Sequence, residues 1–177
     1  MNYIIRPIEE QELEECASVI RAGFLSVAKE FGITKENAPT NGAFLEKEQL
    51  IEERAKGHRM YAAVQGATLI GYLQLEKSTP EIYFLQKLVV LPEYRRLGIG
   101  KALLDYAKER VVEWGGDKLS IGIIEENTVL KNWYLSYGFE PITTRRFEHL
   151  PFTVGFMELK LINNHKEEVG CNLEFRP

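Results

Sequence analysis

The sequence lacks several features that would place it in a specialised class. It has no internal repeat, no low-complexity segment and no long linker rich in Gly, Ser or Pro. Its two cysteines, Cys16 and Cys171, are far apart and neither has a partner at metal-ligand spacing, so we expect two free thiols and no metal. No apolar run approaches the roughly 18 residues of a membrane span, and the N-terminus does not resemble a signal peptide. We therefore expect a cytoplasmic protein that does not bind a membrane.

Positive charge is also scarce. The 177 residues include 22 Lys and Arg against 26 Asp and Glu, which gives a net charge of -4 at pH 7. This balance argues against a nucleic-acid-binding protein, because such proteins gain affinity by neutralising phosphates. Hydrophobic residues make up 45% of the chain, enough for one core without a disulfide or metal. The length is typical of one domain, so we expect residues 1–177 to form a single domain.

Hydrophobic periodicity predicts a mixed α/β order. The expected elements are a strand at 3–8, helices at 10–24 and 44–55, strands at 60–64, 68–75 and 82–91, a helix at 99–114, a strand at 119–124, a helix at 128–137, and strands at 140–147 and 153–161. Residues 65–67 predict a hairpin, and Gly71 predicts a bulge or a close backbone approach. Residues 32–42 predict a loop with at most one helical turn. Three successive strands argue against a doubly wound parallel sheet.

The most informative segment is the transition from strand to loop to helix at residues 88–104. The start of the predicted helix carries Arg95, Arg96, Gly98, Gly100 and Lys101. A helix N-terminus presents unpaired N–H groups and a partial positive charge, so it binds anions such as phosphate. The glycines permit close backbone approach, and the basic side chains add charge. The sequence therefore predicts a site for an anionic cofactor.

Three phosphate-loop patterns compete for this segment. A Walker A loop fails because Arg95 stands at its first glycine and Ala102 at its Ser/Thr, which disfavours a nucleotide-binding phosphotransferase. The dinucleotide fingerprint fails because Leu103 stands at its third glycine. The pattern Arg/Gln-x-x-Gly-x-Gly/Ala is matched by Arg95, Gly98 and Gly100. The alternative to a binding loop is a basic turn with two glycines at a helix start.

Several motifs occur together in a fixed order. They are Ile5-Arg6-Pro7, then Leu88-x-Val90-x-Pro92-x-Tyr94-Arg95-x-x-Gly98-x-Gly100, then Asn127-x6-Tyr134-x3-Gly138-Phe139, and the apolar strand Phe156-Met157-x-Leu159-x-Leu161. In this combination the sequence resembles the GCN5-related N-acetyltransferase (GNAT) superfamily over residues 3–161. The resemblance implies an α/β fold with a mixed, mainly antiparallel central sheet of about six to seven strands, flanked by helices. It also implies a splayed parallel strand pair, here 82–91 and 119–124.

The resemblance implies that acetyl-CoA is the co-substrate and assigns its contacts. Backbone groups of Leu88 and Val90 would bind the pantetheine arm, and the backbone N–H groups of Arg96, Gly98, Gly100 and Lys101 would hold the pyrophosphate. The residues expected to bind the cofactor are Leu88, Val89, Val90, Arg95, Arg96, Leu97, Gly98, Ile99, Gly100, Lys101, Asn127 and Tyr134.

Tyr134 is expected to be catalytic, because it stands where the family's Tyr commonly protonates the departing CoA thiolate. A phenol, with a pKa near 10, holds its proton at neutral pH and can donate it to a thiolate. Each residue also has a simpler interpretation. Asn127 can serve only as a helix N-cap, Tyr134 can be a buried core aromatic, and Arg95 and Arg96 can be solvated surface charges.

The match is incomplete at the general base. Ribosomal-protein acetyltransferases of the family place a Glu five residues before the Asn, where this chain has Gly122, and others use a Glu on the strand at the position of Gln86. The remaining candidates are Glu81, Glu125, Glu126 and His149. A base is not required if the amine arrives neutral. The base is therefore left unassigned.

The acceptor cannot be identified from the sequence. The resemblance implies that it binds near residues 24–44, and residues 37–41 together with Tyr83 and Phe84 could line its pocket. One hypothesis is an N-acetyltransferase that moves an acetyl group directly to a primary amine of a small molecule or peptide. The other is a catalytically silent CoA-binding sensor or interaction module of the same fold. Family members often form homodimers through the late strands, so the resemblance makes a homodimer one expectation, and no role is predicted for the polar tail 162–177.

Overall fold

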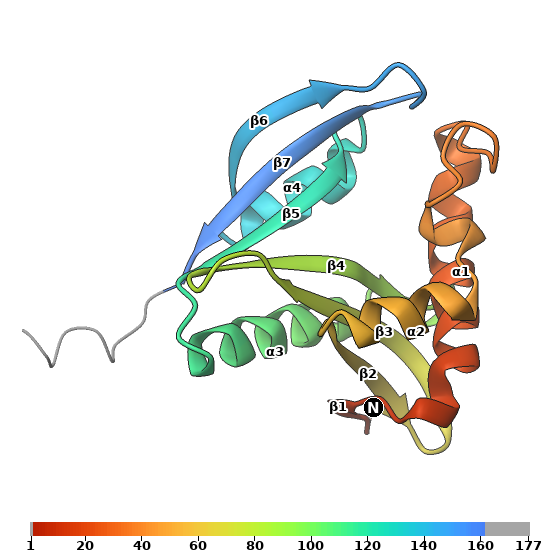
Figure 1. Ribbon diagram of the computed structural model, residues 1–177, viewed down its shortest axis with the longest axis vertical. Coiled ribbons are helices and arrows are strands. Elements are labelled where there is room, and N and C mark those ends of the chain that lie inside the picture. Colours follow the sequence, from red (N-terminus) through yellow and green to blue (C-terminus); the bar gives the residue numbers. More distant parts are fainter. Residues whose placement is uncertain (1, 162–177) are drawn as a thin grey trace, which may run out of the picture.

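The computed structural model describes residues 2–161, and its elements follow the predicted order (Figure 1). The strands are β1 (Ile4–Pro7), β2 (Arg59–Gln65), β3 (Thr68–Lys77), β4 (Ile82–Val90), β5 (Lys118–Ile124), β6 (Glu140–Arg146) and β7 (Thr153–Lys160). The helices are α1 (Leu13–Glu30), α2 (Lys47–Ala55), α3 (Ile99–Glu113) and α4 (Thr128–Ser136). Cys171 and the tail 162–177 lie outside the described residues. None of the helices within residues 2–161 is long and apolar enough to span a membrane.

In residues 2–161, seven strands form one sheet in the order β1-β2-β3-β4-β5-β7-β6. The neighbouring pairs are antiparallel except for β4 and β5, which are parallel. This confirms the predicted mixed, mainly antiparallel sheet with one parallel pair. Gln65 pairs with Thr68, which confirms the predicted hairpin as a two-residue turn.

Three predicted helix boundaries were wrong. The first helix does not begin at Glu10, because Glu10–Glu12 form a 3-10 turn and α1 begins at Leu13. The first helix does not end at Phe24 but continues to Glu30, because Ala28 remains buried on the apolar face of α1. The second helix does not begin at Phe44. Residues 42–44 form a 3-10 turn, where the Asn41 side chain accepts a hydrogen bond from the Ala43 N–H at 2.9 Å, and α2 begins after a capping box at Glu46.

The core has two main parts, one on each face of the sheet, since successive strand side chains point to opposite faces. On one face, α1 and α2 pack on β2 to β4 through residues such as Ile20, Leu50 and Tyr72. On the other face, α3 packs through residues such as Leu103 and Val111. A smaller cluster joins the loop after α1 to β7, with Ile33, Ala38 and Phe152 among its members. That loop therefore lies beside the end of β5, where Ile124 packs against the same cluster.

Gly71 on β3 allows α3 to approach the sheet closely. A Cβ added there would lie 3.0 Å from Leu103 Cδ1 and 3.1 Å from the Val89 carbonyl oxygen. The register of β2 and β3 also shifts beside this residue, between Ala63 and Val64. The predicted close backbone approach at Gly71 is confirmed, and it seats α3 directly beneath the end of β4.

Candidate active site

The two parallel strands β4 and β5 pair over only three positions. Ile82 is opposite Lys118, Tyr83 opposite Leu119, and Phe84 opposite Ser120. Beyond these positions the strands diverge, as Figure 1 shows, and each pairs only with its other neighbour. The facing edges of the two strands therefore have backbone N–H and C=O groups that do not bond each other, which is the setting for an extended ligand.

A β-bulge in β4 accompanies the divergence. Tyr72 is opposite Val89 and Gln74 is opposite Gln86, so that Lys87 and Leu88 together face one residue of β3. Lys87 has a φ of 46°, in the left-handed region. A bulge bends its strand and re-aims the residues that follow. Here it turns β4 away from β5 just before the backbone of residues 88–90.

The loop after β4 ends at the N-terminus of α3. Gly98 is the N-cap with a φ of 82°, and no side chain caps the helix there. The first N–H groups of an α-helix have no intrahelical acceptor, so those of residues 98–101 can receive an anion. A Cβ added at Gly98 would meet no atom within 4 Å, and one at Gly100 would lie 3.7 Å from Trp133 Cζ2. The space at Gly98 is open and Gly100 has room for no more than ordinary contacts with its neighbours, so a pyrophosphate at this helix N-terminus stays a prediction.

The basic side chains of this loop have different partners. Arg95 donates to the Gly23 carbonyl at 2.7 Å, to Ser26 Oγ at 3.2 Å and to the Val90 carbonyl at 3.2 Å. Its guanidinium therefore joins the loop to α1, and a direct contact with a cofactor stays a prediction. Lys101 pairs with Asp105 one turn along α3, and this hydrogen bond raises the pKa of Lys101 above its usual value. Arg96 and Leu97 are exposed beside them.

Asn127 and Tyr134 come from α4. The Asn127 side chain accepts a hydrogen bond from the Leu130 N–H at 3.1 Å, so it is an N-cap, and any contact with a cofactor stays a prediction. Tyr134 is buried, with its ring edge-on to Trp133 at 4.9 Å and to Phe139 at 5.1 Å between centroids. Burial raises the pKa of Tyr134, which keeps the phenol protonated at neutral pH. Because Trp133 also borders Gly100, Tyr134 lies on the helix beside the glycine loop.

The carboxylates considered as bases already have structural partners. Glu125 pairs with Lys131, and Glu126 accepts from the Thr153 N–H at 3.0 Å. Glu81 accepts from Thr79 Oγ1 at 3.1 Å and precedes Ile82, at the end where β4 and β5 are still paired. His149 is the remaining candidate, and its ring lies 6.0 Å from that of Phe147. None of these contacts brings a base to the open edge of β4.

A polar cluster on the α2 face of the sheet was missed by the sequence analysis. Gln74 is fully buried on β3, and its side-chain nitrogen lies 3.0 Å from Glu53 Oε2 and 2.7 Å from His58 Nδ1. Gln86 donates to Glu76, which lies two residues along β3 on the same face. The available signal was alternation, since polar Gln74 and Glu76 share the sheet face that Tyr72 occupies.

The predicted acceptor residues Tyr83 and Phe84 lie on opposite faces. Phe84 lines a hollow of about 100 Å³ together with Ser120, Ile142 and Phe156. Tyr83 is buried on the other face against Trp114, with 5.4 Å between ring centroids, so its predicted place in an acceptor pocket was wrong. The pair cannot line one pocket because adjacent strand residues point in opposite directions. Gly122 lies on the Phe84 face, where an added Cβ would be 3.9 Å from Phe156.

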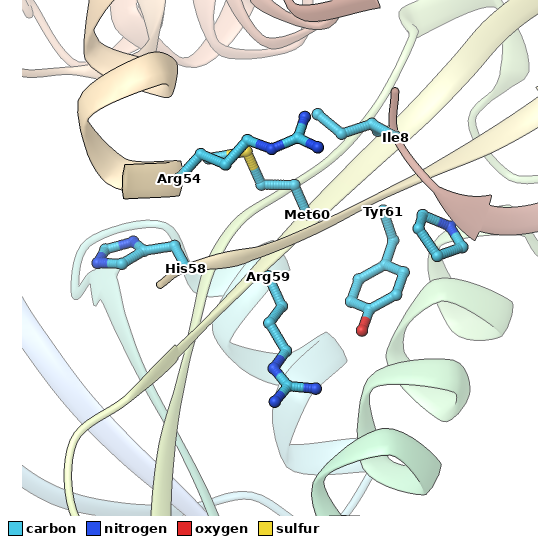
Figure 2. A pocket seen from close by; sticks show the side chains of 7 residues that line it. Ile8, Arg54, His58, Arg59, Met60 and Tyr61 are labelled. Carbon is cyan, nitrogen blue, oxygen red and sulfur yellow. The ribbon is translucent and has the colours of Figure 1, made fainter. Parts of the chain in front are cut away.

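A second hollow lies outside this region. Its volume is about 270 Å³, and Figure 2 shows Arg59 and Tyr61 on one side of β2 with Met60 on the other. The lining contains none of the residues predicted to bind a cofactor. It includes His58 and Arg54, which connect it to the end of α2. In the part of the chain that the structure describes, no group of three or more His, Cys, Asp or Glu side chains could hold a metal ion.

Comparisons with known proteins agree with this geometry. The model of the acetyltransferase (GNAT) family matches residues 26–139. The chain is 31% identical over 161 residues to an uncharacterised N-acetyltransferase of Lactobacillus delbrueckii subsp. lactis, and the match covers 84% of this chain and 87% of that protein.

Solved structures share the fold. The PaiA N-acetyltransferase of Thermoplasma acidophilum, solved in complex with coenzyme A, has a TM-score of 0.76 at 25% identity, covering 90% of this chain and 99% of that one. The ribosomal-protein-S18-alanine N-acetyltransferase of Escherichia coli has a TM-score of 0.73 at 17% identity, covering 90% and 94%. The second likeness shows the fold alone.

Proposed function

The chain belongs to the GNAT acetyltransferase family, and we propose that it transfers an acetyl group directly from acetyl-CoA to a primary amine of a small molecule or peptide. The observation that carries the proposal is the open edge of β4, which lies between a strand bulge and an uncapped helix N-terminus. An extended arm with a diphosphate at one end matches both features. Coenzyme A has that form, and the Thermoplasma relative was solved with it.

Different residues of the chain would bind different parts of the cofactor. Backbone groups of Leu88 to Val90 would bond the pantetheine arm as a neighbouring strand does. The N–H groups from Arg96 to Lys101, which include those of Gly98 and Gly100, would hold the pyrophosphate. Asn127 has an amide nitrogen that its capping bond does not use, and this group would donate to the cofactor.

Acetyl-CoA supplies an activated acetyl thioester when bound. A backbone N–H on the open edge of β4 would stabilise the negative charge that develops on the acetyl oxygen during transfer. Tyr134 would donate its proton to the thiolate that leaves. Its hydroxyl has no hydrogen-bond partner within residues 2–161, so it is available for this contact. Neither cysteine belongs to the motifs, so the transfer would proceed without a covalent enzyme intermediate.

The proton of the acceptor amine needs a destination. Glu76 lies opposite Phe84 on β3, where it accepts a hydrogen bond from Gln86 and lies 3.9 Å from His58 Nε2, so it has structural partners as the other carboxylates do. Its side chain is partly exposed, and we propose that it accepts this proton through water. A Glu76→Gln variant would then lower kcat and leave the affinity for acetyl-CoA unchanged. The matched control is Glu81→Gln, at the paired end of β4. Equal kcat values in the wild type and Glu76→Gln would remove Glu76 from the reaction.

Calorimetric titration tests the cofactor. The wild type should bind CoA and acetyl-CoA with similar affinity and should not bind ATP, since the loop lacks the hydroxyl residue that a Walker A site uses for Mg²⁺. Binding of ATP in preference to CoA would overturn the proposal.

A single domain over residues 1–177 and a cytoplasmic location stay predictions from the sequence.

A second function remains to be tested against the first. Gln86 and Gly122 stand where relatives in the family have a carboxylate, and this favours a CoA-binding sensor or interaction module without catalysis. The two functions share one CoA-binding slot, formed by the open edge of β4 and the N-terminus of α3, and differ in turnover. Release of free thiol with an acetylated product belongs only to the enzyme, whereas tight binding without turnover on any acceptor belongs to the module.

A further inference from the structure

Lys87 occupies a backbone conformation that its residue type disfavours. It stands at the first position of the β4 bulge with a φ of 46°. In the bulge class with a left-handed first residue, that residue is usually glycine, because a Cβ is crowded there. A glycine at this position would be free of the crowding. A lysine here bears that conformational cost, as the exposed Arg96 does at a φ of 62°, and a side-chain contact can offset it.

The structure contains such a contact, from β4 to α2. Lys87 Nζ lies 2.7 Å from Glu53 Oε1 and 2.8 Å from Glu53 Oε2, so the ammonium group bonds both carboxylate oxygens. The lysine side chain is 11% exposed and the glutamate side chain 23%. An ion pair shielded from water in this way is worth more than a pair in open solvent and is costly to break.

Glu53 is itself fixed from β3. Its Oε2 accepts a hydrogen bond from Gln74 Nε2 at 3.0 Å, and Gln74 is fully buried. The side-chain oxygen of Gln74, Oε1, accepts a hydrogen bond from the Tyr72 hydroxyl at 2.8 Å. The side-chain nitrogen of Gln74, Nε2, also lies 2.7 Å from His58 Nδ1. The carboxylate that receives Lys87 is therefore held in place by the strand that faces the bulge.

We propose that the Lys87–Glu53 pair is a tether that holds the β4 bulge in its open form and thereby sets the affinity of the slot for CoA. The inference rests on the proposed function for its ligand. Both are positioning residues, since the pair acts through the backbone of Leu88 to Val90. Without the tether, the strain at Lys87 would favour a regular strand, and only a fraction of molecules would present the binding edge.

The test compares two substitutions at one position. Lys87→Met removes the tether and keeps the crowded Cβ, whereas Lys87→Gly removes both. Calorimetry should give a CoA Kd about tenfold higher for Lys87→Met, from the usual cost of a left-handed non-glycine residue. Lys87→Gly should remain within about twofold of the wild type. Glu53→Ala should match Lys87→Met, and adding Lys87→Gly to Glu53→Ala should restore binding.

Controls separate the tether from general destabilisation. Lys118→Met removes a strand lysine that lies 3.9 Å from Glu158, at the paired end of β5, and should not change the Kd. Hydrogen exchange without CoA should show faster exchange at Leu88 to Val90 in Lys87→Met and rates near the wild type in Lys87→Gly. If Lys87→Met does not fold, Glu53→Ala supplies the same comparison.

Several results would overturn the tether. An equal loss of CoA affinity in Lys87→Gly and Lys87→Met would mean that the lysine itself binds the ligand. Unchanged affinity and exchange in both Lys87→Met and Glu53→Ala would mean that the pair does not hold the bulge. If the wild type does not bind CoA, the proposed function fails, and the exchange rates alone decide whether the tether exists.

Discussion

Arg95 donates a hydrogen bond to the backbone carbonyl of Gly23, with 2.7 Å between the two atoms. The contact joins the loop before α3 to the middle of α1, across 72 residues of sequence. Gly23 also allows a close approach of α1 to β4, because a Cβ added there would lie 1.7 Å from Val89 Cγ2. The helix, the bulged strand and the glycine loop therefore meet at one place.

Replacing Arg95 by alanine removes three hydrogen bonds at this junction. We expect the free energy of unfolding to fall by about 1 kcal/mol, since the bonds involve a partly exposed charged group. The affinity for CoA should fall as well, because the loop is no longer fixed to α1. Urea denaturation and calorimetry measure the two effects. Arg96→Ala is the control for stability, and its free energy of unfolding should stay within about 0.5 kcal/mol of the wild type. An equal loss of unfolding free energy in Arg95→Ala and Arg96→Ala would contradict the account.

Substitutions at Gly100 should change the binding of CoA without preventing the protein from folding. A Cβ at this position has 3.7 Å to Trp133 and 3.9 Å to Val90, so alanine fits the free protein. Gly100→Ala should leave the free energy of unfolding unchanged or raise it by up to about 1 kcal/mol, from its better helix propensity. Gly100→Glu should also fold and should show no CoA binding by calorimetry. Wild-type affinity in Gly100→Glu would exclude the pyrophosphate site.

Tyr134→Phe keeps the aromatic packing and removes the proton donor. We expect kcat to fall about 100-fold or more with the Kd for CoA unchanged. Tyr137→Phe is the matched control, since that ring also packs on Trp133, at 4.8 Å, and should leave kcat unaltered. Steady-state kinetics with calorimetry distinguish the two variants. A normal turnover number for Tyr134→Phe would remove the acid role.

The raised pKa of Tyr134 has a second consequence. Burial favours the neutral phenol in the folded state, so the stabilising contribution is complete below the ordinary tyrosine value of 10 and is lost as the pH rises above it. The free energy of unfolding of the wild type should therefore fall more steeply above pH 10 than that of Tyr134→Phe. Urea denaturation from pH 8 to pH 11 measures the difference, and parallel curves would count against burial of this phenol.

Cys16 should be unreactive in the folded protein. It is completely buried, and burial raises the pKa of its thiol to about 12, so almost no thiolate exists near pH 8. In a Cys171→Ser background, iodoacetamide should add no label to the native protein and one label in urea. Mass spectrometry counts the labels. Rapid native labelling that also abolished activity would reopen a covalent route through cysteine.

Much of the site could be predicted because its signals are local. The glycines and basic residues after β4 indicate an anion-binding helix start within a short stretch of sequence, and the order of helices and strands along the chain follows from periodicity. Lys87 gave no such signal, since a lysine does not mark a left-handed residue. The cluster around Gln74 joins residues up to 34 positions apart, so only the folded chain brings it together.

The acceptor side was predicted less well, for a different reason. Tyr83 and Phe84 were assigned to one pocket, although alternation places them on opposite faces. Because helices cover both faces of this sheet, both residues had an apolar environment available. The sequence pattern alone could not say which face α3 covers.

The central claim is transfer of an acetyl group to an amine, and one experiment measures it directly. The wild type is mixed with acetyl-CoA and a panel of amines and peptides, while free thiol and the mass of each acceptor are followed together. The account predicts sustained thiol release matched by an equal amount of acetylated amine on at least one acceptor, with neither in Gly100→Glu. Tight binding of acetyl-CoA with no acetylated product on any acceptor would contradict it.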